Sequence, residues 1–178
     1  MSSGDRTNLR PPVPSGSTVG SVCAVTSLER LIREEQELQF ERFDHDTAWA
    51  LGLALVEAAR AVGAPLAIDI RRNGHQLFHA ALPGTSPDND AWLRRKTRVV
   101  DRFGHSSLYV GERARQEGTT FEEQMRLQPD RYAAHGGGFP ITVRGVGVVG
   151  TVAVSGLPQL EDHAFVVRVL SEFLGVAR

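Results

Sequence analysis

The clearest candidate for chemistry in this sequence is a run of three glycines preceded by a histidine. His135 comes directly before Gly136, Gly137 and Gly138. Consecutive glycines allow backbone N–H groups to converge on an anion, and a histidine can ligate a metal or accept a proton. The alternative is a flexible turn that carries a capped histidine and binds nothing.

Lys96 is a second candidate, because it is the single lysine among 20 basic residues. A chain that otherwise uses only arginine could need an ammonium group at this position. The alternative is one more solvated charge on a basic helix. That helix lacks interleaved aromatic residues, so we expect no nucleic-acid binding from it.

A third group surrounds the start of the last predicted helix. The free N–H groups near Gln159 could face the same place as the glycines. Asp162 and His163, in the first turn, could also merely cap the helix. Together with Ser155 they suggest a hydrolase triad, but no G-x-S-x-G motif is present, and adjacent residues cannot orient each other as a triad requires.

Two further motifs are rejected on spacing. The G-x-G-x-x-G pattern at 145–150 is followed by more β-branched residues, whereas a dinucleotide site needs a helix there. His75 and His79 stand about 13 Å apart on a strand, too far to share one metal ion. We therefore expect no metal site.

Length and composition predict one globular domain. The chain has 178 residues, of which 41% are hydrophobic and 23% charged, and its formal net charge is −1. With Cys23 alone, no intrachain disulfide can form. We find neither a signal peptide nor a membrane-spanning run, so we expect a cytoplasmic protein with no membrane contact.

The pattern of the chain predicts a flexible N-terminal arm over 1–26 and a single domain over 27–178. The arm is rich in Ser, Gly and Pro, and Ser27 could cap the first helix. Asn73-Gly74 predicts a tight hairpin. The expected order is helix (27–38), helix (44–63), hairpin (66–70 with 76–82), helices (86–104, 106–117 and one from Thr120), hairpin (139–143 with 146–154), helix (from Gln159). This order predicts an α/β sandwich around one largely antiparallel sheet.

Several linked segments resemble an uncharacterised protein family related to the haem-degrading, GlcG-like (HbpS-like) domain superfamily. They are 67–74 (AIDIRRNG), 82–90 (LPGTSPDND), 94–96 (RRK), 135–141 (HGGGFPI), 154–158 (VSGLP) and 161–163 (EDH). The resemblance spans about 28–174. It implies a profilin-like α/β (α+β) fold, with a central, mainly antiparallel sheet of about five strands flanked by helices. It also implies homo-oligomers, either dimers or larger rings.

The resemblance also marks site residues. It matches a superfamily lysine to Lys96, a Gly-Gly-x-Pro-Ile loop to 137–141, and a Ser-Gly turn followed by an acidic residue to Ser155 and Asp162. The chain differs from the family in having His135 ahead of the loop, in having Pro158 in the turn, and in lacking a secretion signal. These differences argue against extracellular haem sensing.

Our leading hypothesis is an oligomeric protein whose pocket takes a tetrapyrrole such as haem, or another small anionic molecule. The alternatives are a protein-interaction or assembly protein without small-molecule chemistry, and an enzyme acting on a small oxygenated metabolite; catalytic residues remain unknown. The candidate ligand-binding residues are Lys96, His135, Gly136, Gly137, Gly138, Ser155, Gln159, Asp162 and His163, with Asp69, Arg71 and Arg95 as a second tier.

Overall fold

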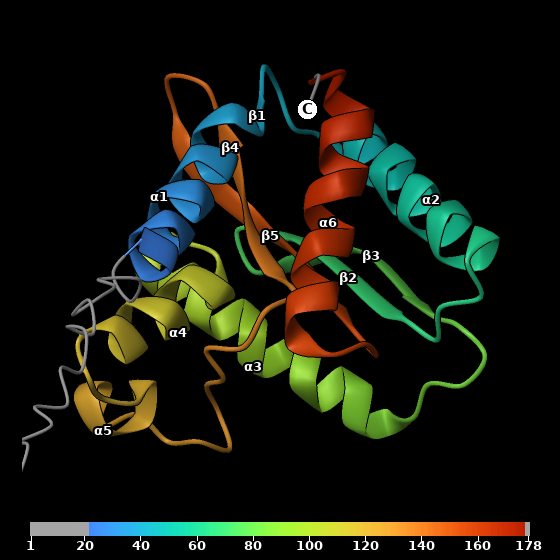
Figure 1. Cartoon of the computed structure of the whole chain (residues 1–178). Helices are drawn as coiled ribbons and strands as arrows, with labels where there is room; N and C mark the ends of the chain where they lie inside the picture. The colour runs from blue at the N-terminus through green and yellow to red at the C-terminus, as the bar shows by residue number, and fades with distance from the viewer. Residues whose placement is uncertain (1–21, 177–178) are drawn as a thin grey trace, which may run out of the picture.

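A computed structural model describes residues 22–176, with side chains from residue 28 onward (Figure 1). The elements are α1 (Val22–Glu37), β1 (Gln39–Phe40), α2 (His45–Ala61), β2 (Ala67–Arg72), β3 (His75–Ala81), α3 (Pro87–Phe103), α4 (Ser107–Gln116), α5 (Phe121–Met125), β4 (Gly138–Val143), β5 (Gly147–Ser155) and α6 (Gln159–Leu174). Within the described residues, no helix is both long and apolar enough to span a membrane.

The five strands form one sheet in the order β1-β4-β5-β2-β3. The β4–β5, β5–β2 and β2–β3 pairs are antiparallel, and the short β1 pairs parallel with β4. This confirms the expected mainly antiparallel sheet. The pairing places Gly138 opposite Ala153 and Ala67 opposite Ser155, so the end of β5 lies beside the start of β4 and of β2.

Helices cover both faces of the sheet (Figure 1). Strand residues alternate between the faces. One set, which includes Ile68 and Val154, packs in the main core with the apolar sides of α2 and α6. The other set, which includes Ala67 and Ala153, packs against Leu93 of α3. The first turn of α6 and the buried side of α3 therefore approach the same end of β5 from opposite faces.

Local sequence signals account for most element boundaries. Asn73 and Gly74 adopt φ values of 48° and 79° in the first hairpin, as its turn requires. Ser86 and Asn89 form a capping box at the start of α3, and Thr120 and Glu123 form another at α5. The structure therefore confirms the predicted turn at Asn73-Gly74 and the predicted helix starts at Ser86 and Thr120.

The first helix departs from expectation. It begins at Val22 rather than at Ser27, because 22–26 contains neither glycine nor proline to break a helix upstream of the serine. Residues 1–21 of the predicted arm lie outside the described part of the chain. The G-x-G-x-x-G segment continues as strand β5, which agrees with its rejection as a nucleotide site.

Candidate functional site

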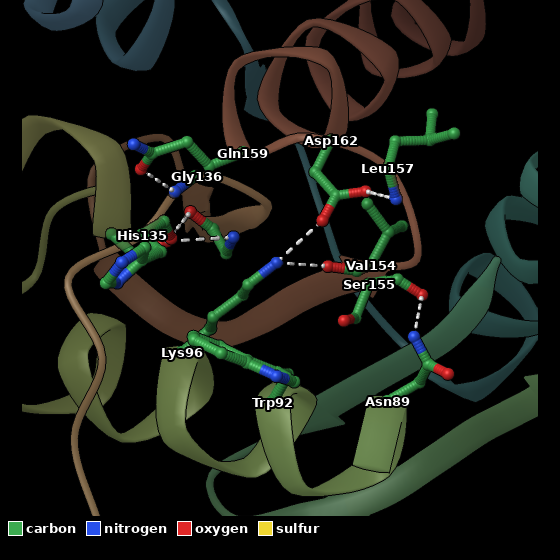
Figure 2. Close-up of polar contacts among 12 residues, drawn as sticks. Asn89, Trp92, Lys96, His135, Gly136, Val154, Ser155, Leu157, Gln159 and Asp162 are labelled. Atoms are coloured by element: carbon green, nitrogen blue, oxygen red, sulfur yellow. Dashed lines mark hydrogen bonds and ion pairs between the residues drawn. The ribbon is translucent and has the colours of Figure 1, made fainter. Parts of the chain in front are cut away.

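A buried ion pair joins α3 to α6. Lys96 Nζ donates to Asp162 Oδ2 at 2.7 Å and to the carbonyl oxygen of Val154 at 3.0 Å (Figure 2). Lys96 is 3% exposed and Asp162 1%. The other carboxylate oxygen, Oδ1, accepts from the backbone N–H of Leu157 at 3.0 Å, which fixes the turn that leads into α6.

Burial perturbs both members of this pair. Desolvation lowers the pKa of Lys96 from its usual value, while the nearby Asp162 carboxylate opposes that shift. Desolvation likewise raises the pKa of Asp162, opposed mainly by the Lys96 ammonium. Burial therefore shifts the two pKa values toward each other, and perturbed pairs of this kind are concentrated at functional sites.

The glycine run packs tightly onto this pair. Gly137 has a φ of 115°, and a Cβ there would stand 2.7 Å from Lys96 Nζ and 2.6 Å from the carbonyl oxygen of Val154. At Gly136 a Cβ would lie 2.0 Å from the carbonyl oxygen of Gln159. Neither position has room for a side chain. The glycines therefore serve close backbone packing beside the ammonium.

The expectation that N–H groups of the run hold an anion is wrong for two of the three. The N–H of Gly136 donates to Gln159 Oε1 at 3.3 Å, and the N–H of Gly138 donates to Ser107 Oγ at 3.0 Å. Donors already used within the protein are not free for a ligand.

His135 lies half-buried at the entrance to the run. Its ring meets the Trp92 ring edge-on, with the centroids 5.3 Å apart, and Arg95 stacks on the same indole at 3.9 Å. Its buried Nδ1 has no hydrogen-bond partner among the described residues. Burial lowers the pKa of His135 below 6.5, so the imidazole is neutral at pH 7.

These groups surround a cavity of about 290 Å³, which we call the Lys96 cavity. Its lining residues are Asp88, Asn89, Trp92, Lys96, His135, Ser155, Gly156, Leu157, Gln159 and Asp162. The first turns of α3 and α6 both contribute, so two helix N-termini meet at the cavity (Figure 2). Asn89 Nδ2 also reaches the carbonyl oxygen of Ser155, at 3.4 Å.

The sequence identified five residues of this lining, namely Lys96, His135, Ser155, Gln159 and Asp162, and missed the other residues that α3 supplies, Asp88, Asn89 and Trp92. Asp88, Trp92 and Lys96 are spaced at i, i+4 and i+8, which places them on one face of a helix. That spacing was visible in the sequence. Trp92 Nε1 donates to Asp88 Oδ2 at 3.1 Å, which holds the indole along the cavity wall.

His163 does not belong to the Lys96 cavity, contrary to expectation. Its Nε2 lies 2.9 Å from Glu34 Oε2 of α1, in a buried pair, and it lines a separate cavity of about 510 Å³ between α1 and α6. Successive helix residues differ by about 100° in direction, so Asp162 and His163 face different neighbours.

The second-tier residues also lie elsewhere. Asp69 binds Arg71 Nε at 2.6 Å and accepts from Gln76, in a polar groove of about 340 Å³ between β3 and α3. Arg95 packs on Trp92 and does not line the Lys96 cavity. His79 pairs with Asp90 at 3.0 Å in the same groove as Asp69. Within the described residues, no three His, Cys, Asp or Glu side chains are placed to hold a metal ion.

Comparisons with known proteins agree with this fold. A family model described as "Haem degrading protein HbpS-like" matches residues 43–171. A UPF0303 protein of Streptomyces coelicolor is 61% identical over 159 residues, which is 89% of this chain and 99% of that protein. A UPF0303 protein of Edwardsiella ictaluri is 49% identical over 150 residues, or 84% of this chain and 96% of that protein.

Several solved structures share the fold of this chain. The Ybr137w protein has 35% sequence identity and a TM-score of 0.77, covering 83% of this chain and 87% of that one. HbpS has 22% identity and a TM-score of 0.61, covering 77% and 93%. PduOC, solved as a heme complex, has 17% identity and a TM-score of 0.60, covering 74% and 94%. The last two likenesses concern the fold alone.

Proposed function

The chain belongs to the UPF0303 family and to the HbpS-like haem-degrading family. We propose that it binds a small oxygenated metabolite, neutral or with one carboxylate, in the Lys96 cavity. The observation that carries this proposal is the ion pair of Lys96 and Asp162, which lines a cavity of polar side chains. Buried charges cost several kcal/mol each, so their retention beside a cavity supports a binding role.

Charge around the cavity favours a ligand of low net charge. Asp88, Lys96 and Asp162 together carry one formal negative charge. Each helix N-terminus contributes roughly half a positive charge, so those of α3 and α6 about offset it. A hydroxyl, a carbonyl or a single carboxylate matches that balance, and a dianion does not. This narrows the broad anionic ligand expected from the sequence.

The volume sets the ligand's size. A water molecule occupies about 30 Å³ of liquid, so about 290 Å³ holds roughly ten non-hydrogen atoms. Ser155 and Gln159 add polar side chains to the wall, and Trp92 adds a flat apolar surface. A short hydroxy or oxo acid fits this description.

Trp92 provides the assay. The chain has two tryptophans, and Trp49 lies on α2, 58% exposed and outside the cavity lining. In a Trp49→Phe protein, emission reports on the cavity wall alone. We expect a saturable change in emission with pyruvate, lactate or glycolate, each of which carries one carboxylate; the affinity should weaken at least tenfold in His135→Ala and be unchanged in His79→Ala. A flat titration with all three acids overturns the proposal.

Haem is a second candidate, favoured by the family description and by the His135 imidazole at the cavity. A haem does not fit inside, because a porphyrin has several times more atoms than about 290 Å³ accommodates. The carboxylates of Asp88 and Asp162 in the cavity lining also disfavour a ligand with two propionates. A haem could only lie across the mouth with His135 as an axial ligand. The unpartnered Nδ1 gives that imidazole none of the second-shell support usual for metal ligands.

A haemin titration followed by visible absorbance separates the two candidates. Haem binding at this site predicts a saturable Soret shift that His135→Ala abolishes and His79→Ala leaves intact. An identical shift in all three proteins removes His135 from any haem site. The expected homo-oligomer and cytoplasmic location remain predictions, and light scattering on the full chain tests the first of them.

A further inference from the structure

Lys96 keeps one donor for the cavity. An ammonium has three N–H donors, and Nζ uses two of them on the carbonyl oxygen of Val154 and on Asp162 Oδ2. Gly137 closes in from the side, since a Cβ there would stand 2.7 Å from Nζ. Lys96 also lines the Lys96 cavity, so a ligand bound there would lie beside this side chain.

The residue type has a chemical meaning at this position. Every other basic residue of the chain is arginine or histidine, and an arginine cannot lose its proton in a protein. A lysine can, and a desolvated lysine amine is a good nucleophile toward carbonyl carbon. If the ion pair with Asp162 only held α3 against α6, an arginine at position 96 would supply the same positive charge. The single lysine of the chain therefore stands where a nucleophilic amine could react with a ligand in the cavity.

We propose that the ligand is a small carbonyl compound of the 2-oxo acid type and that Lys96 Nζ forms a reversible Schiff base with it. This inference rests on the proposed function, since it names the ligand class of the same cavity. Asp162 is the proton acceptor, 2.7 Å from Nζ. Residues of the first turns of α3 and α6 line the cavity, so the partial positive charge of these helix N-termini would stabilise the ligand carboxylate and the oxygen on which charge develops.

The step balances without any further reactant. A proton passes from Nζ to Asp162, leaving a neutral amine and a carboxylic acid. The amine lone pair bonds to the carbonyl carbon, the C=O pair moves to oxygen, and the oxygen takes back the proton held by Asp162. A second proton then moves from the attacking nitrogen to the same oxygen. Loss of that oxygen as water leaves an iminium ion on Nζ, so ammonium plus carbonyl compound gives iminium plus water. Burial, which lowers the pKa of Lys96 and raises that of Asp162, reduces the cost of the first transfer.

Reductive trapping of the full chain tests the step. Pyruvate, glyoxylate or 2-oxobutyrate is added with cyanoborohydride, and modified peptides are mapped by mass spectrometry. Only the Lys96 amine and the N-terminal α-amine can be alkylated, so the second is an internal reference for unspecific reaction. We expect Lys96 to react at least tenfold faster than the α-amine. Lactate has no ketone or aldehyde group and cannot form a Schiff base. It should compete for the cavity, slow the labelling of Lys96 and leave the labelling of the α-amine unaffected.

Two variants sharpen the result. Lys96→Arg keeps the charge and should lose the internal adduct. Asp162→Asn keeps the lysine and should slow trapping at least tenfold relative to the α-amine, with a cooperative urea unfolding transition confirming that the variant is folded. Labelling of the α-amine alone with all three probes overturns the Schiff base. If pyruvate still saturates the Trp92 signal, the proposed function stands without it; if no acid changes that signal, both fail.

Discussion

Replacing either Lys96 or Asp162 alone should lower the free energy of unfolding far more than replacing both together. The two side chains are 4% and 1% exposed, and the atoms that meet are 2.7 Å apart. Asp162→Asn leaves a buried ammonium without its counter-charge, and Lys96→Met leaves a buried carboxylate. The double variant leaves neither charge, and its asparagine still offers an oxygen to the N–H of Leu157.

The distance gives the scale. At 2.7 Å and an effective dielectric constant of about 20, the attraction is about 6 kcal/mol, and desolvation of the two ions offsets most of it. Each single substitution should lower the free energy of unfolding by about 3–5 kcal/mol. The double variant should lose about 1–3 kcal/mol, chiefly because the carbonyl oxygen of Val154 loses its donor. The two single losses together should exceed the double loss by at least about 3 kcal/mol.

The pH dependence of the single variants should have opposite signs. In Asp162→Asn the pKa of Lys96 lies below 10.5 when folded, so the unfolded chain binds more protons and stability rises as the pH rises through the folded pKa toward 10.5. In Lys96→Met the pKa of Asp162 lies above 3.8 when folded, so the folded chain binds more protons and stability rises as the pH falls through the folded pKa toward 3.8. Neither slope can exceed about 1.4 kcal/mol per pH unit.

Urea unfolding of the four proteins at pH 5, 7 and 9 measures these quantities. Single losses below about 1 kcal/mol, or slopes of the same sign in both single variants, would refute this account of a desolvated pair.

Three further predictions test the surroundings of the pair. Gly136→Ala should destabilise the fold by about 3 kcal/mol in urea unfolding, because its Cβ meets the carbonyl oxygen of Gln159, whereas Gly145→Ala, with open space around it, should cost about 1 kcal/mol. His163→Ala should lower stability through the loss of its buried pair with Glu34 while leaving ligand affinity at the Trp92 reporter within twofold of the parent; a tenfold loss would return His163 to the site. Because burial lowers the pKa of His135, calorimetric affinity for lactate should change less between pH 7.5 and 6.5 than protonation of a histidine with its ordinary pKa would produce, and a change that large would contradict the lowered pKa.

Local chemistry made most of the fold predictable. The Asn73-Gly74 turn and the Ser86 cap depend on residues within four positions of each other, and the structure has both where the sequence predicts them. The start of α1 was not predictable from Ser27, because a serine caps a helix only where the chain before it is not helical. Parallel pairing of the two-residue β1 with β4 also has no local signal.

The site was harder, since its decisive contact joins residues 66 positions apart. The sequence identified Lys96 and Asp162 separately, and only the packing of α3 and α6 on either side of β5 brings them together. His163 was misplaced because the position of α1, which supplies Glu34, decides which way that ring turns. Trp92 was missed although its helical spacing from Lys96 pointed to the same face.

The most direct test of the central claim is the emission of Trp92 in a Trp49→Phe protein titrated with pyruvate, alongside the same protein carrying Lys96→Met and Asp162→Asn. A cavity that binds short oxo acids through its buried pair predicts a saturable change in the first protein and none in the second. Equal titration curves in the two folded proteins would place the ligand elsewhere and contradict the account.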